Sequence, residues 1–225
     1  MITWGISANS HDGALAVFKD DQLIFASHSE RFSGIKNDPH LDHKMINYAK
    51  KLAGEPDLVC WYENPTWKLT RQIYAGQNIS ECFDDIHIKR YLASYDIHAP
   101  IKYGSHHESH AAGAFYTSPF KSCAVLCIDS IGEWNTTSVW KAGPDGLKKV
   151  WTQNYPNSIG LWYSAMTQRC GLKPNEEEYI LMGMAAYGDK RRLAEHIEED
   201  FFNGTSAKVN LHRGCKWWEI GRAHV

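Results

Sequence analysis

Three strand-like stretches follow one another at the start of the chain with almost no residues between them. They are ITWGIS at 2–7, GALAVFKD at 13–20 and QLIFASHSERF at 22–32, and the pair Asp20-Asp21 favours a tight turn before the third. Parallel neighbours need a crossover connection of about a dozen residues or more, and these gaps are far shorter. The spacing therefore predicts an antiparallel meander and argues against a doubly wound parallel sheet.

The remaining chain alternates between helical and strand patterns. Residues 40–54 carry a helical stripe of apolar side chains at Leu41, Met45, Tyr48 and Leu52. Buried strands are predicted at 57–62 and 123–130, two strands joined at Pro144-Asp145-Gly146 within 135–154, and helices at 158–171 and 189–202. Residues 64–100 are irregular, with a partly helical stretch at 82–95. This order predicts an α/β fold with a mixed sheet.

Composition restricts the partners and the compartment. The formal net charge of −2 gives no electrostatic reason to expect nucleic acid or an anionic membrane as a partner. No apolar run approaches the roughly 18 residues of a membrane helix, and the first residues lack the pattern of a signal peptide. The six cysteines form no CxxC pair, and most lie in apolar runs. We therefore expect a cytoplasmic protein without nucleic-acid or membrane partners.

The stretch GSHHESHAAGAFYTSPF at 104–120 holds a cluster of three histidines. On a helix, His106 and His110 project from one face about one turn apart, so that two imidazoles can reach one ion. His107 points about 100° away from them. Taken alone, an HxxxH spacing is more often a pair of half-exposed polar residues at a helix start, here capped by Gly104-Ser105. Both interpretations stay open on this stretch alone.

Two further stretches place reactive side chains at turns. His11 and Asp12 lie at the turn after the first strand, and Asp129 ends a strand before the loop that contains Gly132. A carboxylate at the end of a strand before a glycine loop is frequent at ligand sites, because the loop lets backbone N–H groups approach a phosphate or a carbonyl. Each stretch taken singly is more often an ordinary turn.

Together these stretches resemble the carbamoyltransferases of the nodulation-protein U and tobramycin-carbamoylating type. Their N-terminal domain is like the tRNA threonylcarbamoyl-transfer protein and has the actin-like ATPase (ribonuclease H-like) fold. Five segments carry the resemblance in the family's order, at 11–18, 30–38, 106–120, 124–138 and 178–188. The resemblance implies an α/β actin-like fold with a mixed sheet, of which this chain holds the first lobe and the start of the second.

The resemblance also implies an O-carbamoyltransferase. In this family, ATP and carbamoyl phosphate form carbamoyl adenylate in a C-terminal domain, and the N-terminal domain passes the carbamoyl group to a hydroxyl of a small-molecule or sugar acceptor. His106 and His110 would be two ligands of a divalent metal, iron by resemblance, although imidazole also suits zinc or nickel. The ion would act as a Lewis acid on the carbamoyl group.

Further roles follow from the same resemblance. His11 would be the general base that takes the proton of the acceptor hydroxyl, and Asp12 would set the tautomer of a neighbouring histidine. Lys36 would be catalytic and cofactor-binding, because its positive charge offsets that of a developing oxyanion or a phosphate. Asp129 would be catalytic and cofactor-binding, because it would orient the ion or the intermediate, and Gly132 would belong to the cofactor-binding loop.

The chain departs from the family pattern at its C-terminal end. NEEEY at 175–179 replaces the Asn-Ser-Gly-Glu-Tyr of relatives, so a glycine that freely adopts positive φ is missing. By the same resemblance, we expect the family's third metal ligand, a downstream aspartate, and its adenylate-forming domain to lie outside this sequence. EIGRAHV at 219–225 can be back-translated into a common DNA-sequencing adapter. We therefore expect residues 1–218 to be a partial carbamoyl-transfer domain and 219–225 to be an adapter artefact.

Two other functions stay open. A kinase or ATPase can share this fold, because fold does not fix function, but it has no need of the HxxxH pair. A non-catalytic lobe that binds a nucleotide or a partner, left by truncation, would have an incomplete metal site and exposed apolar surface.

Overall fold

The computed structural model describes residues 1–78, 82–83 and 86–201. The expected adapter-encoded segment 219–225 lies outside the described residues, as do the last residue of the helix predicted at 189–202 and two residues of the stretch at 82–95.

The chain forms two compact units. Of the described residues, the first unit comprises those within 1–70 and 78–109, and the second comprises 71–77 and 110–201. Each unit contains one sheet, so the two are described in turn.

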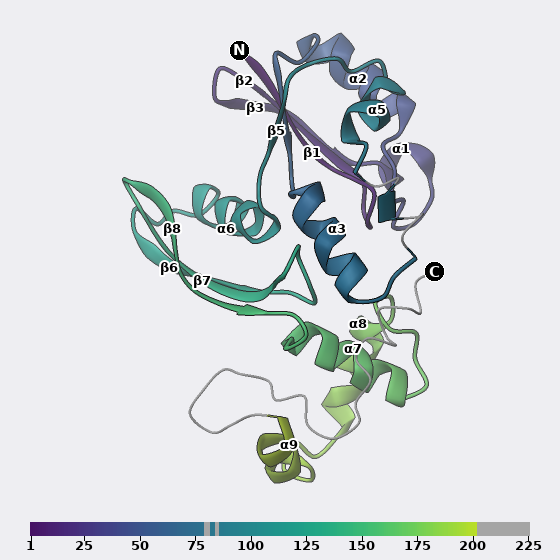
Figure 1. Ribbon diagram of the computed structural model, residues 1–225, viewed down its shortest axis with the longest axis vertical. Helices are drawn as coiled ribbons and strands as arrows, with labels where there is room; N and C mark the ends of the chain where they lie inside the picture. The colour runs from purple at the N-terminus through teal and green to yellow at the C-terminus, as the bar shows by residue number, and fades with distance from the viewer. Residues whose placement is uncertain (79–81, 84–85, 202–225) are drawn as a thin grey trace. The chain divides into compact units, whose positions relative to one another are not determined.

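The first unit is built on a five-stranded sheet of order β3-β2-β1-β4-β5 (Figure 1). The strands are β1 (Ile2–Ser7), β2 (Ala14–Lys19), β3 (Gln22–His28), β4 (Leu58–Trp61) and β5 (Ile101–Tyr103). β1 pairs antiparallel with β2 and parallel with β4, and β4 pairs parallel with β5. The predicted meander and the predicted α/β class with a mixed sheet are confirmed, and the strand order is that of an actin-like (ribonuclease H-like) lobe.

Two helices cover one face of this sheet, namely α2 (His43–Ala53) and α5 (Ile88–Ala93) (Figure 1). Trp4 and Ile6 alternate along β1 and are both buried in the core that these helices close. α2 begins where the sequence places a good cap, because Asp42 Oδ1 accepts hydrogen bonds from the backbone N–H of Lys44 and Met45 at 2.7 and 3.1 Å.

The buried side of α2 differs from the predicted stripe. Met45 is buried as expected, but its buried partners are Ile46 and Ala49, whereas Tyr48 and Leu52 are about half exposed. The ring of Tyr48 instead packs at the edge of the core, with centroids 5.3 Å from Phe25 and 6.2 Å from Phe32. A short α1 (Glu30–Ser33) supplies Phe32 to this aromatic contact.

Residues 64–100 contain a helix that the sequence analysis missed, α3 (Pro65–Tyr74). Asn64 Oδ1 accepts hydrogen bonds from the backbone N–H of Thr66 and Trp67, both at 3.1 Å. An asparagine cap followed by proline in the first helical position is a recognised start signal, so the pair Asn64-Pro65 could have located α3.

The second unit has an antiparallel sheet of order β6-β7-β8. Its elements are β6 (Cys123–Ile128), β7 (Asn135–Gly143), β8 (Gly146–Asn154), α7 (Ile159–Arg169), α8 (Glu178–Met184), the 3-10 turn η1 (Ala185–Tyr187) and α9 (Ala194–Phe201). β7 and β8 meet at the predicted turn, with Gly143 opposite Gly146. Helix α6 (His106–Tyr116) packs Ala111 and Phe115 against Val125 and Trp140 of this sheet.

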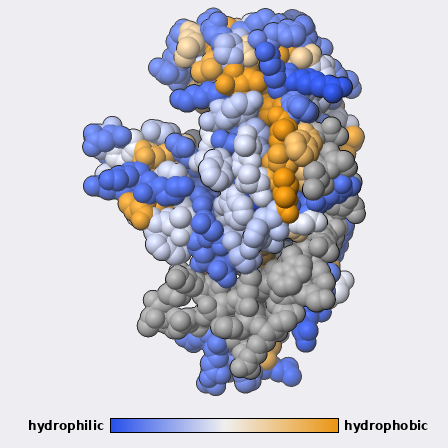
Figure 2. Space-filling view, in the orientation of Figure 1, coloured by the Kyte–Doolittle hydropathy of each residue, from blue (hydrophilic) through white to orange (hydrophobic). Residues whose placement is uncertain are grey.

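Hydrophobic residues also reach the surface among hydrophilic ones on the face that Figure 2 shows. The exposed hydrophobic side chains of the first unit include Leu23 and Ile24 of the edge strand β3. Within the described part of the chain, no helix is both long enough and apolar enough to cross a membrane.

Replacing Leu15 by alanine tests the core of the first unit. Leu15 on β2 is 1% exposed, so Leu15→Ala should lower the free energy of unfolding by about 2–5 kcal/mol in urea denaturation. The matched control is Leu23→Ala on the neighbouring strand, where the side chain is 57% exposed and the expected change is within about 0.5 kcal/mol. Equal losses in both variants would contradict the core assignment.

Candidate functional site

The parallel strands of the first unit all end at one edge of their sheet. β1, β4 and β5 run in the same direction, and their carboxyl ends are followed by His11, Glu63 and His106 respectively. In open sheets, ligands bind in the crevice beyond the carboxyl ends of parallel strands. The strand order thus gathers three chemically useful segments at the edge where a ligand is expected.

His11 lies in the turn between β1 and β2 and is exposed. Its Nδ1 is 3.0 Å from Oδ2 of Asp12, which itself adopts a left-handed conformation with φ of 51°. With Nδ1–H donating to the carboxylate, Nε2 is left as the acceptor of the neutral ring. This distance therefore allows Asp12 to set the tautomer of His11, which is the role expected for it from the sequence.

Backbone hydrogen bonds hold the turn of His11 against the segment that follows Lys36. Asn9 N–H donates to Pro39 O at 2.8 Å, and Gly13 N–H donates to Asp38 O at 2.6 Å. A Cβ at Gly13 would lie 2.5 Å from the backbone oxygen of His40, so this approach needs glycine. Lys36 lies exposed in the loop between α1 and α2, two residues before the tied segment.

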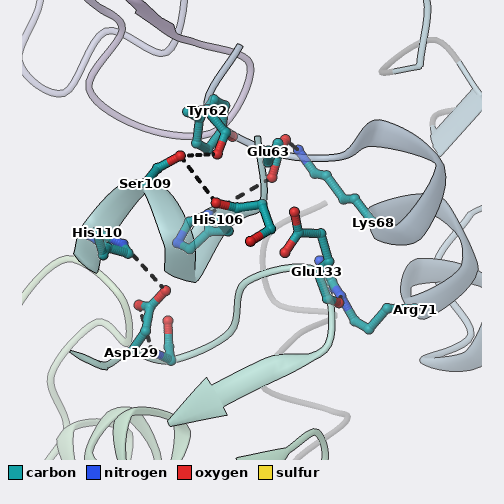
Figure 3. Close-up of polar contacts among 11 residues, drawn as sticks. Tyr62, Glu63, Lys68, Arg71, His106, Ser109, His110, Asp129 and Glu133 are labelled. Atoms are coloured by element: carbon teal, nitrogen blue, oxygen red, sulfur yellow. Dashed lines mark hydrogen bonds and ion pairs between the residues drawn. The ribbon is translucent and has the colours of Figure 1, made fainter. Parts of the chain in front are cut away.

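Helix α6 carries the histidine pair. The predicted helix is confirmed, with His106 and His110 one turn apart, while His107 is fully buried and does not join them. The start of the helix is fixed to the end of β4, because Gly104 N–H donates to Trp61 O at 2.9 Å and Ser109 Oγ donates to Tyr62 O at 2.7 Å (Figure 3).

Asp129 faces His110 within the second unit. It follows β6, and its Oδ2 lies 3.8 Å from His110 Nε2, as Figure 3 shows. Its other oxygen, Oδ1, accepts a hydrogen bond from Ser130 N–H at 2.7 Å. The two facing atoms are closer than about twice a metal–ligand bond of roughly 2.1 Å, so a single ion can contact both.

The start of α7 holds the Asp129 loop in place. Ser158 is fully buried, and its Oγ donates to Ser130 O at 2.7 Å while it accepts from Leu161 N–H at 3.0 Å. A Cβ at Gly160 would lie 2.5 Å from the backbone nitrogen of Ser130. Sequence reasoning missed both positioning residues, although a serine three residues before Leu161 is an ordinary N-cap signal.

The donor set fits a divalent metal. Among the described residues, one group of three side chains offers ligand atoms: His106 and His110 on one helix, and Asp129 opposite His110. Two imidazoles and one carboxylate form the donor set that suits non-haem iron(II). Sequence reasoning gave Asp129 a catalytic and cofactor-binding role but did not predict it as a metal ligand, because its distance from His110 depends on packing that the sequence does not display.

Gly132 is buried in the loop after Asp129. Its N–H donates to Asn135 O at 2.8 Å, which closes the turn into β7. A role for Gly132 in cofactor binding stays a prediction, and the same holds for Lys36.

Comparison with known proteins points to one family. Residues 69–217 match the family described as "Carbamoyltransferase N-terminus". The chain is 36% identical over 214 residues to an uncharacterized protein of Synechocystis, covering 83% of this chain and 35% of that protein. It is 29% identical over 209 residues to nodulation protein NolNO of Sinorhizobium fredii, covering 86% of this chain and 31% of that protein. The chain spans about a third of the length of these curated relatives.

Among solved structures, YeaZ from Pseudomonas aeruginosa matches with a TM-score of 0.42 and 10% identity, over 69% of this chain and 67% of that one. The Listeria monocytogenes protein Lmo2764 matches with a TM-score of 0.41 and 12% identity, over 88% of this chain and 74% of that one. We assign the fold class from the observed strand order and not from these two structures.

Replacing Gly160 by alanine tests the packing of α7 against the Asp129 loop. The added Cβ must displace backbone atoms, so Gly160→Ala should lower the free energy of unfolding by about 1–3 kcal/mol in urea denaturation. Gly113→Ala in α6 is the matched control, because nothing lies within 4 Å of its Cβ position, and it should stabilise by about 0.4–1 kcal/mol. A Gly160→Ala variant as stable as Gly113→Ala would refute the close approach.

Proposed function

The chain belongs to the carbamoyltransferase N-terminal family, and from that premise we propose that the intact protein is an O-carbamoyltransferase. It would transfer a carbamoyl group from carbamoyl adenylate to a hydroxyl of a small-molecule or sugar acceptor. Carbamoyl adenylate would be formed from carbamoyl phosphate and ATP in a separate adenylate-forming domain. A cytoplasmic location without nucleic-acid or membrane partners remains part of this proposal.

The observation that carries the proposal is the pairing of His110 with Asp129 at 3.8 Å, next to His106 on the same helix. Together these residues would hold a divalent ion, and their donor set supports iron(II). When bound, such an ion polarises a carbonyl or neutralises phosphate charge as a Lewis acid. A kinase or ATPase of the same fold has no need of this donor set, which favours the carbamoyltransferase.

His11 would act as the general base. Its Nδ1 is hydrogen-bonded to Asp12 at 3.0 Å, so Nε2 is the nitrogen that accepts a proton. The acceptor oxygen would form a bond to the carbamoyl carbon, its proton would pass to Nε2 of His11, and the bond from that carbon to the adenylate phosphate oxygen would break. AMP then leaves with the electron pair of that bond.

Lys36 would supply positive charge to this step. Lys36 lies in an exposed loop, and a hydrogen bond from Gly13 N–H to Asp38 O ties that loop to the turn of His11. This placement supports a role for Lys36 in offsetting the charge of the oxyanion or the leaving phosphate. Gly132 would contribute to the loop that receives the adenylate. Asp129 would hold the ion and orient the intermediate.

Removing one imidazole tests the metal site. In the untagged chain, His110→Ala should weaken Co²⁺ binding, measured by isothermal titration calorimetry, on the order of 100-fold, because one of three ligands is lost. His98→Ala is the matched control, since His98 forms a comparable exposed pair with Asp96 at 3.1 Å. If both variants bind Co²⁺ as the unchanged chain does, the proposed metal site is wrong.

Removing the base tests the transfer step. In the intact protein supplied with carbamoyl phosphate, ATP and a panel of hydroxyl acceptors, His11→Asn should lower kcat by about 10²–10⁴-fold and leave the bound metal unchanged. His98→Asn, which changes the other exposed His–Asp pair, should leave kcat as it is. An unaffected kcat in His11→Asn would remove His11 from the mechanism.

A further inference from the structure

Glu63 is a buried carboxylate that no part of the proposed reaction uses. It follows the end of β4, and its side chain is only 7% exposed. Removing a carboxylate from water costs several kcal/mol unless a partner compensates for it. The partner is Lys68 in the first turn of α3, whose Nζ lies 2.9 Å from Glu63 Oε1 and is itself nearly buried.

A buried ion pair of this kind is weak evidence for a stabilising role. Well-packed apolar residues of similar volume are often as stable or more stable than a buried pair of charges. The position of the second carboxylate oxygen offers a more specific role. Glu63 Oε2 is turned away from Lys68 and lies 4.0 Å from Nδ1 of His106, which is 15% exposed (Figure 3).

Contacts with Tyr62 hold Glu63 and His106 in this arrangement. Ser109 Oγ donates to Tyr62 O at 2.7 Å, so the first turns of α6 are fixed to the residue immediately before Glu63. The ring of Tyr62 meets the ring of His106 edge-on, with centroids 5.7 Å apart. The backbone of Glu63 and the ring of His106 are therefore both held by direct contacts with Tyr62 and its neighbours.

From this arrangement we infer that Glu63 is a positioning residue for His106. By accepting a hydrogen bond from Nδ1–H, it orients the ring and leaves Nε2 as the ligand atom, while Lys68 Nζ donates to its other oxygen. This inference rests on the metal site of the proposed function. The separation of 4.0 Å is longer than a hydrogen bond, and it should shorten when the ring binds an ion. Carboxylate partners of metal-bound histidines typically change metal affinity by about 10–100-fold.

Glu63→Gln tests the inference in the whole chain through two measurements. Calorimetric titration with Co²⁺ should show a dissociation constant about 10–100-fold weaker than that of the unchanged chain. In the metal-free chain, ¹H–¹⁵N NMR of the imidazole nitrogens should show a larger fraction of His106 protonated at Nδ1 than in Glu63→Gln, because the charge of the carboxylate attracts the Nδ1 proton even across 4.0 Å. A purely structural ion pair would change stability without moving this NMR signature.

The matched control is Glu108→Gln, which removes the same charge from an exposed position on α6. It should leave both the Co²⁺ affinity and the His106 signals unchanged. Because Glu63→Gln removes a carboxylate partner of the nearly buried Lys68 and could unfold the chain, the double variant Glu63→Leu/Lys68→Met serves as a second test. It removes both charges of the Glu63–Lys68 pair together, so it should keep the fold, and it should show the same loss of affinity.

A folded double variant that binds Co²⁺ within twofold of the unchanged chain would overturn the role of Glu63. So would an unchanged tautomer of His106 in both Glu63→Gln and the double variant. If the unchanged chain itself binds no Co²⁺, the proposed metal site fails, and the NMR measurement alone then decides whether Glu63 acts on His106.

Discussion

In the first unit, β1 lies between an antiparallel neighbour and a parallel one, and this pairing decides where the functional segments lie. In the meander β1-β2-β3, β2 occupies one edge of the central strand β1. β4 therefore pairs with the other edge of β1, and it runs parallel to β1. The carboxyl ends of β1, β4 and β5 then lie at one edge of the sheet. Three segments come directly after these strand ends, namely the turn of His11, the carboxylate of Glu63 and the start of α6.

The candidate ligands and the proposed base are supported differently. His106 is surrounded by nearly buried groups, and the loop of Asp129 is held by Ser158 and by the close approach of Gly160. His11 and Lys36 are exposed on turns. Rigid support suits residues that hold an ion, because displaced ligands lose affinity, whereas a base has to be accessible to an acceptor that enters from solvent.

Local patterns predicted most of the fold. The meander, the mixed sheet, the turn at Pro144-Asp145-Gly146 and the helix of the histidine pair are confirmed. α3 was missed although its cap signal, Asn64 followed by Pro65, was present in the sequence. The stripe of α2 was partly wrong, because a periodic pattern does not show how far a neighbouring strand covers each side chain, and Tyr48 packs with Phe25 at the edge of the core.

The sequence by itself determined that His106 and His110 share one helical face, since backbone hydrogen bonds set that spacing wherever the helix lies. It also determined that His11 has Asp12 beside it. Only the tertiary structure decided that Asp129 faces His110 and that Glu63 faces His106. These pairs are separated by 19 and 43 residues along the chain, and their distances depend on strand pairing and on the packing of α6, which no local pattern encodes.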